Sequence, residues 1–148
     1  MLTVARAEVR PTVSLPLSPR AAYRRLASDS ESLLLDLRSL PEWQLVGVPD
    51  LRALGKTPIF LSWQAYPDMA VQPAFGTALL SEGVGPDTPL YLLCRTGDRA
   101  PVAAQALATS GFTALHPIAD GFEGPPDQQG RRGRLAGWKA EGLPWVQQ

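Results

Sequence analysis

Short runs of apolar residues alternate along the chain with segments whose apolar positions recur at helical spacing. The apolar runs have the length of β-strands and cover residues 32–38, 57–63, 89–93 and 112–118. Helical spacing or helix signals cover residues 19–28, 41–43, 69–80 with an interruption near Pro73, and 100–110. This alternation predicts an α/β fold of three layers, in which helices cover both faces of a central, mainly parallel sheet.

Residues that favour helix ends mark two of these helices. Ser18 before Pro19 is typical of an N-cap followed by the first helical position, and Asp29 follows the last turn. In the helix over 100–110, Pro101 occupies the first turn and Gly111 is the stop signal. We expect one face of that helix to pack on the sheet, comprising Val102, Ala103, Ala106 and Leu107.

We expect residues 1–148 to form one domain, because 148 residues suit a single core and no internal duplication is visible. The loose alternation of apolar and polar residues over 1–17, broken by Pro11 and Pro16, predicts an arm that includes one edge strand. The core is expected to span about 12–124, and the Gly-, Pro- and Arg-rich remainder, 125–148, to pack on it through Trp138 and Trp145.

Composition and charge narrow the classes of protein that fit. Hydrophobic residues make up 45% and charged residues 19%, which indicates a globular chain. Fourteen Lys and Arg balance fourteen Asp and Glu, so there is no electrostatic reason to expect nucleic acid or a membrane as a partner. The first eleven residues carry Arg6, Glu8 and Arg10 in place of a signal peptide's apolar core. We therefore expect a cytoplasmic location.

Cys94 and His116 are the only cysteine and the only histidine. A disulfide within the chain and a Cys/His zinc cluster are both excluded. An unpaired cysteine also fits a reducing compartment. We expect neither a metal nor an organic cofactor.

The cysteine lies where an α/β fold binds its ligands, at the carboxyl end of a strand. The segment Cys-Arg-Thr-Gly-Asp-Arg, Cys94 to Arg99, joins the run at 89–93 to the next helix. Gly97 permits a positive φ, and the successive N–H groups of such a turn form an anion-binding nest at a helix N-terminus. These N–H groups, with Arg95 and Arg99, would stabilise a Cys94 thiolate beside an anionic ligand. The alternative is a buried, inert cysteine.

This segment resembles the active-site loop of the rhodanese-like sulfurtransferases. Other stretches are similar to the family's pattern in matching order over about residues 12–124: Asp36-Leu37-Arg38, Glu42-Trp43 with Gly47-Val48-Pro49, Gly111-Phe112 and Asp120-Gly121-Phe122-Glu123-Gly124. Two residues depart from that pattern. Gly47 stands where the family usually has His, and Asp98 places a negative charge inside the loop, which partly cancels Arg95 and Arg99.

The resemblance implies transfer of sulfane sulfur through a persulfide on Cys94. Its thiolate would attack a small anionic donor such as thiosulfate, and cyanide, a small thiol or a protein thiol would accept the sulfur. Arg95 and Arg99 would supply positive charge for the donor, while Thr96, Gly97 and Asp98 would form the backbone cradle. Without a second cysteine, any thiol acceptor must come from outside the chain.

Two alternatives compete with this interpretation. One is a cysteine-dependent phosphatase or arsenate reductase, since related folds host those chemistries. The phosphatase loop has the pattern Cys-x5-Arg, which would need an arginine at position 100, and the residue there is Ala100. A non-catalytic persulfide carrier or a regulatory binding module of the same fold stays open, and kinetics with small donors and acceptors would separate it from an enzyme.

The remaining candidates favour structural roles. We expect His116 to be a hydrogen-bonded structural histidine, and Asp36 and Arg38 to fix neighbouring loops. Trp63 is expected near the mouth of the site or in the core. The cluster of Arg131, Arg132 and Arg134 is either a solvated loop or a recruiting patch for an anionic donor or an acidic partner.

Overall fold

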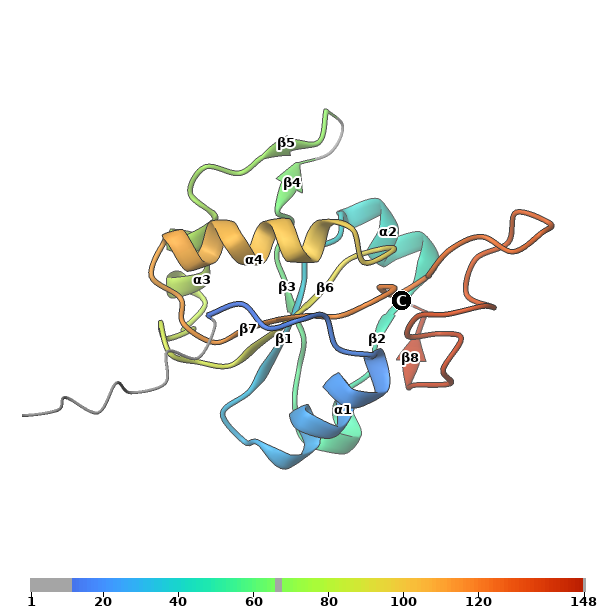
Figure 1. The fold of residues 1–148 in the computed structure, drawn as a ribbon, viewed down its shortest axis with the longest axis horizontal. Helices are drawn as coiled ribbons and strands as arrows, with labels where there is room; N and C mark the ends of the chain where they lie inside the picture. Colours follow the sequence, from blue (N-terminus) through green and yellow to red (C-terminus); the bar gives the residue numbers. More distant parts are fainter. Residues whose placement is uncertain (1–11, 66–67, 148) are drawn as a thin grey trace, which may run out of the picture.

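A four-stranded parallel sheet forms the centre of the computed structural model, which describes residues 12–65 and 68–147 (Figure 1). The strand order is β3-β1-β6-β7, with β1 at Leu33–Asp36, β3 at Ile59–Phe60, β6 at Leu90–Leu93 and β7 at Leu115–Pro117. Isolated parallel bridges pair Val13 with Leu115 and Leu17 with Ile118, so part of the expected arm lies along the β7 edge. The rest of that arm, residues 1–11, lies outside the described residues.

Helices cover both faces of this sheet, which confirms the predicted three layers. Figure 1 shows α4 (Arg99–Thr109) on one side of the strands and α1 (Pro19–Ser28) on the other. Along β6, Leu90 and Leu92 pack into one core with α4 and α3 (Phe75–Ser81), whereas Tyr91 and Leu93 pack into a second core with α1. This alternation is what a parallel sheet buried on both faces requires.

The two helices with marked ends begin and end close to the predicted residues. The Ser18 side chain accepts a hydrogen bond from the Ala21 amide at 3.1 Å, and Asp29 caps the end of α1. The buried face of α4 was predicted wrongly in part, because Val102 and Ala106 are exposed. Its buried residues are Ala100, Ala103, Ala104 and Leu107. Apolar residues surround most of this helix, so periodicity allowed two stripes, and the small alanines let it lie close to the sheet.

The helix predicted over 69–80 is wrong before Phe75. Residues 70–71 instead form β5 (Ala70–Val71), which pairs antiparallel with β4 (Gln64–Ala65). Pro73 disfavours helical backbone at the residue before it, and α3 begins only two residues later. The short helix expected at 41–43 is α2, which spans Leu40–Val46.

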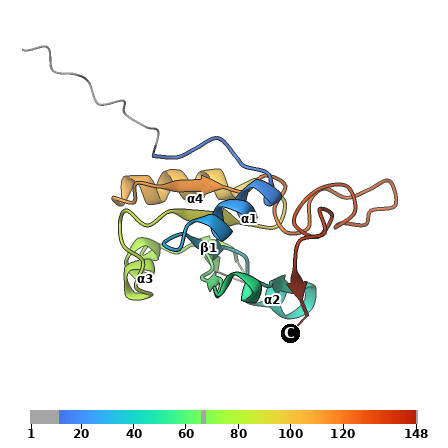
Figure 2. The same cartoon turned by 90° about the horizontal axis from the view of Figure 1, so that it is seen from below.

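The C-terminal segment, residues 125–147, closes against the core beside α2 (Figure 2). Its β8 (Trp145–Val146) pairs antiparallel with β2 (Val48–Pro49), which precedes the 3-10 turn Arg52–Leu54. Trp138 is fully buried and its indole N–H donates to the carbonyl of Pro144 at 2.7 Å. Trp145 remains 40% exposed, so most of the anchoring falls to Trp138.

Candidate active site

Cys94 directly follows β6, at the carboxyl edge of the parallel sheet. The residue is 2% exposed and packs in the same core as Trp63 and Ala100. The backbone N–H of Gly97 donates a hydrogen bond to its Sγ at 3.2 Å. The cysteine loop, residues 94–98, then leads into α4. The thiol therefore lies beside a polar N–H group at a helix start, which is the arrangement that stabilises negative charge on sulfur.

Gly97 is the residue that lets the cysteine loop close. Its φ is +95°, and a side chain there would bring a Cβ within 2.6 Å of the backbone nitrogen of Asp120. Both the left-handed conformation and the close approach require glycine. The loop thus packs directly on the turn that follows β7.

That turn, residues 120–124, holds the loop through its backbone. The amide of Phe122 donates to the carbonyl of Cys94 at 2.8 Å, and the amides of Glu123 and Gly124 donate to the carbonyl of Arg95 at 2.9 and 3.2 Å. The Gly97 amide donates to the cysteine sulfur and not to one of these carbonyls. The geometry of the thiol site is therefore determined by two segments that lie far apart in sequence.

The charged side chains in and next to the cysteine loop have different surroundings. The Arg95 Nε donates to Oε2 of Glu123 at 2.9 Å, and Arg95 is half-exposed while Glu123 is nearly buried. Asp98 makes no capping hydrogen bond to α4 and instead accepts one from the Thr96 hydroxyl at 3.2 Å. Arg99, in the first turn of α4, is exposed. Sequence reasoning missed the Arg95–Glu123 pair, because no local pattern links residues 28 positions apart.

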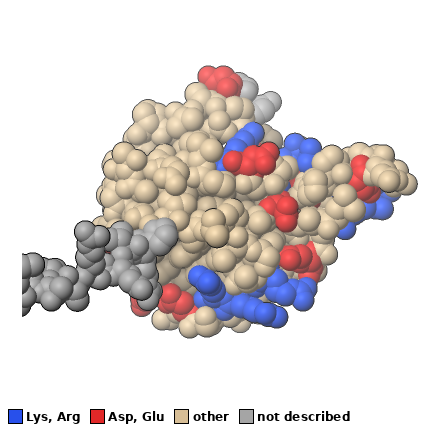
Figure 3. Space-filling view, in the orientation of Figure 1, with Lys and Arg blue, Asp and Glu red and all other residues tan. Residues whose placement is uncertain are grey.

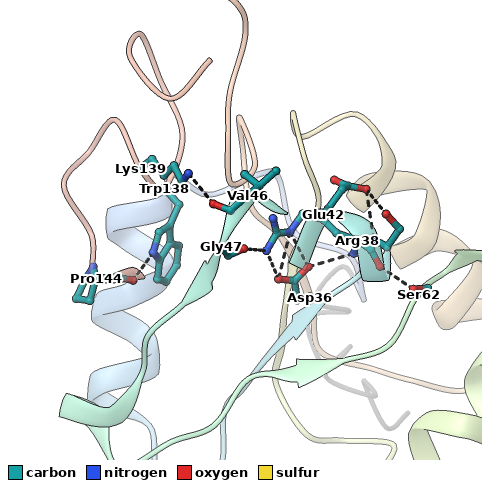
Figure 4. A network of polar contacts seen from close by, with 10 residues as sticks. Asp36, Arg38, Glu42, Val46, Gly47, Ser62, Trp138, Lys139 and Pro144 are labelled. Carbon is teal, nitrogen blue, oxygen red and sulfur yellow. Dashed lines mark hydrogen bonds and ion pairs between the residues drawn. The ribbon is translucent and has the colours of Figure 1, made fainter. Parts of the chain in front are cut away.

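Asp36 and Arg38 form a buried ion pair that braces the site (Figure 4). The Arg38 guanidinium donates hydrogen bonds of 2.8 to 3.2 Å to both carboxylate oxygens of Asp36, and it also donates to the carbonyl of Gly47 at 2.9 Å. Its other face lies 4.2 Å from the ring centre of Phe122. The pair thus links the end of β1, the end of α2 and the turn that holds the cysteine loop, as expected of residues that fix neighbouring loops.

The contacts of His116 and Trp63 indicate structural roles. The Nδ1 of His116 lies 3.0 Å from the Ser14 hydroxyl, and its ring stacks on Tyr91 with centroids 4.8 Å apart. Burial, and secondarily the charge of Arg25, lowers the pKa of His116, so the imidazole is neutral at pH 7. Trp63 is buried in the core that contains Cys94.

The arginine cluster of the C-terminal segment is tied partly to its own surroundings. Arg132 donates to the carbonyl of Gly124 at 2.9 Å, and the Arg134 guanidinium lies 4.0 Å from the Asp127 carboxylate. Arg131 is exposed, and its amide donates to Asp127. Arg132 therefore binds the last residue of the 120–124 turn.

Other kinds of site find little support among residues 12–65 and 68–147. In this part of the chain no three His, Cys, Asp or Glu side chains gather where they could hold a metal ion. None of its helices is long and apolar enough to cross a membrane. A groove of about 540 Å³ lies between α2, the end of β3 and α3, lined by Trp43, Phe60 and Phe75 among others, and the cysteine loop does not line it.

Comparison with known proteins places this geometry in a family. A family model described as the STR4 middle domain matches residues 16–148. An uncharacterised protein of Rickettsia conorii is 35% identical over 124 residues, which are 84% of this chain and 90% of that protein. The chloroplastic rhodanese-like domain-containing protein 4 of Arabidopsis thaliana is 29% identical over 131 residues, which are 88% of this chain but 25% of that protein.

Solved structures share the fold. The crystal structure of Rv0390 from M. tuberculosis superposes with a TM-score of 0.80 at 36% identity, covering 90% of this chain and 97% of that one. The polysulfide-sulfur transferase homodimer of Wolinella succinogenes superposes with a TM-score of 0.60 at 23% identity, covering 90% and 79%. At that identity the second likeness shows the fold alone.

Proposed function

Because the chain belongs to the rhodanese-like family, we propose that it is a sulfurtransferase that carries sulfane sulfur as a persulfide on Cys94. Its donor is a small sulfane-sulfur compound, of which thiosulfate is the simplest probe, and its acceptor is cyanide or an external thiol. Since Cys94 is the only cysteine, the persulfide is not released by an internal disulfide.

The transfer consists of two displacements at sulfur. The Cys94 thiolate attacks the outer sulfur of thiosulfate, a Cys94 S–S bond forms, the donor S–S bond breaks, and sulfite leaves with the electron pair. The products are a Cys94 persulfide anion and a sulfite dianion, so charge is conserved. An acceptor thiolate or cyanide then attacks the outer sulfur of the persulfide and returns the Cys94 thiolate.

The contact between the Gly97 amide and the Cys94 sulfur, 3.2 Å long, carries this proposal. It shows a backbone donor aimed at the sulfur, in a loop that opens α4, where the first-turn amides have no partner within the helix. Such donors stabilise a thiolate and a persulfide anion without any reorganisation. Arg99 adds positive charge in the first turn, and Arg95, Thr96, Gly97 and Asp98 form the remainder of the cradle.

The burial of Cys94 also bears on the substrate. At 2% exposure the residue admits a small donor more readily than a bulky one, because almost none of its surface is open to solvent. We therefore expect small alkyl persulfides and inorganic donors to react before large protein persulfides do.

The intact mass of the reduced protein tests the proposal directly. Incubation with thiosulfate or with a small alkyl persulfide is expected to add about 32 Da, one sulfur atom, to the wild type and nothing to Cys94→Ser, and cyanide is expected to remove it. Steady-state turnover with cyanide distinguishes a catalyst from a carrier that charges once. The proposal is wrong if neither donor changes the mass of a protein whose Cys94 is still alkylated by iodoacetamide.

A further inference from the structure

The arginine that follows the cysteine is held by a carboxylate from another segment. Arg95 and Glu123 touch twice: the Arg95 side chain donates to the Glu123 carboxylate at 2.9 Å, and the Glu123 amide donates to the Arg95 carbonyl at 2.9 Å. The Glu123 side chain is only 11% exposed. A nearly buried carboxylate is costly to leave unpaired. The Arg95 guanidinium therefore does not turn toward a donor unless the Glu123 carboxylate loses its ion-pair partner.

Further carboxylates accompany the cysteine loop. Asp98 lies within it, and Asp120 packs its backbone against Gly97. Arg99 is the second cation of the loop. The cysteine loop and the residues packed on it thus carry three carboxylates, on Asp98, Asp120 and Glu123, and two guanidiniums, on Arg95 and Arg99, and the one contact between these groups is the Arg95–Glu123 pair.

Other cations near the 120–124 turn already have partners within the protein. Arg38, which lies over the ring of Phe122, is paired with Asp36. Arg132 donates to the carbonyl of Gly124, and Lys139 donates to the carbonyl of Val46 at 2.8 Å, with its ammonium 3.9 Å from the ring centre of Trp145. On the face shown in Figure 3, acidic and basic side chains lie interspersed toward the end of the molecule that carries the C-terminal segment. A field of this kind attracts a dianion weakly.

We propose that Glu123 determines donor specificity: by holding Arg95 and offsetting its charge, it makes the site favour sulfane donors of low charge, such as an alkyl persulfide, over dianionic donors such as thiosulfate. The inference rests on the proposed persulfide chemistry of Cys94. With an alkyl persulfide RSSH, the Cys94 thiolate takes the outer sulfur, and the thiol RSH leaves with the proton. That reaction brings no dianion to the loop, whereas thiosulfate brings one and releases another as sulfite.

Rate constants for charging Cys94 test this assignment. The reduced chain of residues 1–148 is mixed with thiosulfate or with 2-hydroxyethyl persulfide at the same pH and ionic strength, and the persulfidated fraction is followed by intact mass. The measured quantity is the ratio of the thiosulfate rate constant to the alkyl persulfide rate constant. A general loss of loop geometry lowers both rate constants and leaves their ratio unchanged. A change in charge selectivity, in contrast, changes the ratio.

Glu123→Gln is expected to raise this ratio about tenfold, because it removes one negative charge and releases Arg95 toward the donor. In an Arg95→Gln background the same substitution is expected to raise the ratio by less, since no guanidinium is released. Added salt is expected to lower the ratio more steeply for Glu123→Gln than for the wild type. Glu82→Gln is the matched control, because Glu82 caps α3, which Figures 1 and 2 show at the opposite end from the C-terminal segment.

A second variant keeps the test decisive if Glu123→Gln folds poorly. Asp98 is exposed, and Asp98→Asn is expected to raise the ratio about threefold by the same electrostatic reasoning. The assignment is overturned if both variants charge with either donor and their ratios stay within twofold of the wild type. Failure of the wild type to charge with either donor is a different result, and it refutes the proposed function instead.

Discussion

Removing the guanidinium of Arg38 is the most informative perturbation of the framework behind the cysteine loop. Arg38→Met keeps an unbranched apolar side chain of similar reach but deletes every polar contact of the guanidinium. The Asp36 side chain is fully buried, and the Arg38 side chain supplies three of its hydrogen bonds, of 2.8, 3.0 and 3.2 Å, so that only the 3.1 Å bond from the Arg38 backbone amide remains. The carbonyl of Gly47 also loses its 2.9 Å donor, and Phe122 loses the cation over its ring.

The magnitude follows from the burial of the partner that remains. Stranding a buried charge costs about 3–5 kcal/mol, a large share of the roughly 5–15 kcal/mol that stabilises a domain. At about 2–4 °C per kcal/mol for a chain of this size, the melting temperature is expected to fall by roughly 6–20 °C. Replacing both residues, Asp36→Leu with Arg38→Met, leaves no buried charge and is expected to recover most of the loss.

The chain contains its own control for this experiment. Asp50 and Arg52 repeat the same spacing and the same fork geometry, with Nη2 and Oδ2 again 2.8 Å apart, but Arg52 is 81% exposed. Arg52→Met is therefore expected to cost far less stability than Arg38→Met, because water solvates the Arg52 guanidinium and still reaches part of the Asp50 carboxylate.

Urea unfolding followed by tryptophan fluorescence measures both variants, since the fully buried Trp138 reports the loss of the core. A midpoint shift of about 2 M is expected for Arg38→Met at an m-value of about 2 kcal/mol/M. If Arg38→Met loses no more stability than Arg52→Met, burial does not make the ion pair of Asp36 and Arg38 important, and the reasoning fails.

Two further outcomes follow from the loop and from the only histidine. Gly97→Ala would bring a Cβ within 2.6 Å of the Asp120 nitrogen at a positive φ, so this variant is expected to slow persulfidation at least tenfold and to lower the melting temperature. Gly55→Ala is the control, because its Cβ would meet nothing within 4 Å, and it should leave persulfidation unchanged. Equal persulfidation rates in the two variants would contradict the role given to Gly97. Burial, with a smaller effect of Arg25, lowers the pKa of His116 in the folded protein below 6.5. As pH falls, the histidine is therefore protonated in the unfolded chain before it is protonated in the folded one. Stability is expected to fall as pH drops from about 6.5 through the lower folded pKa. Urea midpoints at pH 7.5 and 5.5 should therefore differ less in His116→Gln than in the wild type, and an unchanged difference would show that other groups dominate.

The sequence was informative wherever the signal is local. A strand that ends just before Cys94, a glycine three residues after the cysteine and a helix start are all contiguous. The rule that parallel strands present ligand sites at their carboxyl ends located the thiol. Ser18 and Pro19 likewise determine the start of α1 through their own backbone and side-chain preferences. In each case the residues that interact are neighbours in the chain, so their pattern could be recognised without the fold.

Tertiary structure decided what depends on two distant segments approaching each other. The stripe of α4 that faces the sheet was ambiguous, because Val102 and Ala106 are as apolar as the alanines that are buried. The pairing of Arg95 with Glu123 and the packing of Arg38 on Phe122 exist only because the turn after β7 closes against the end of β6. Periodicity determines which residues share a face, whereas the way turns and strands pack determines which face is buried and which charges meet.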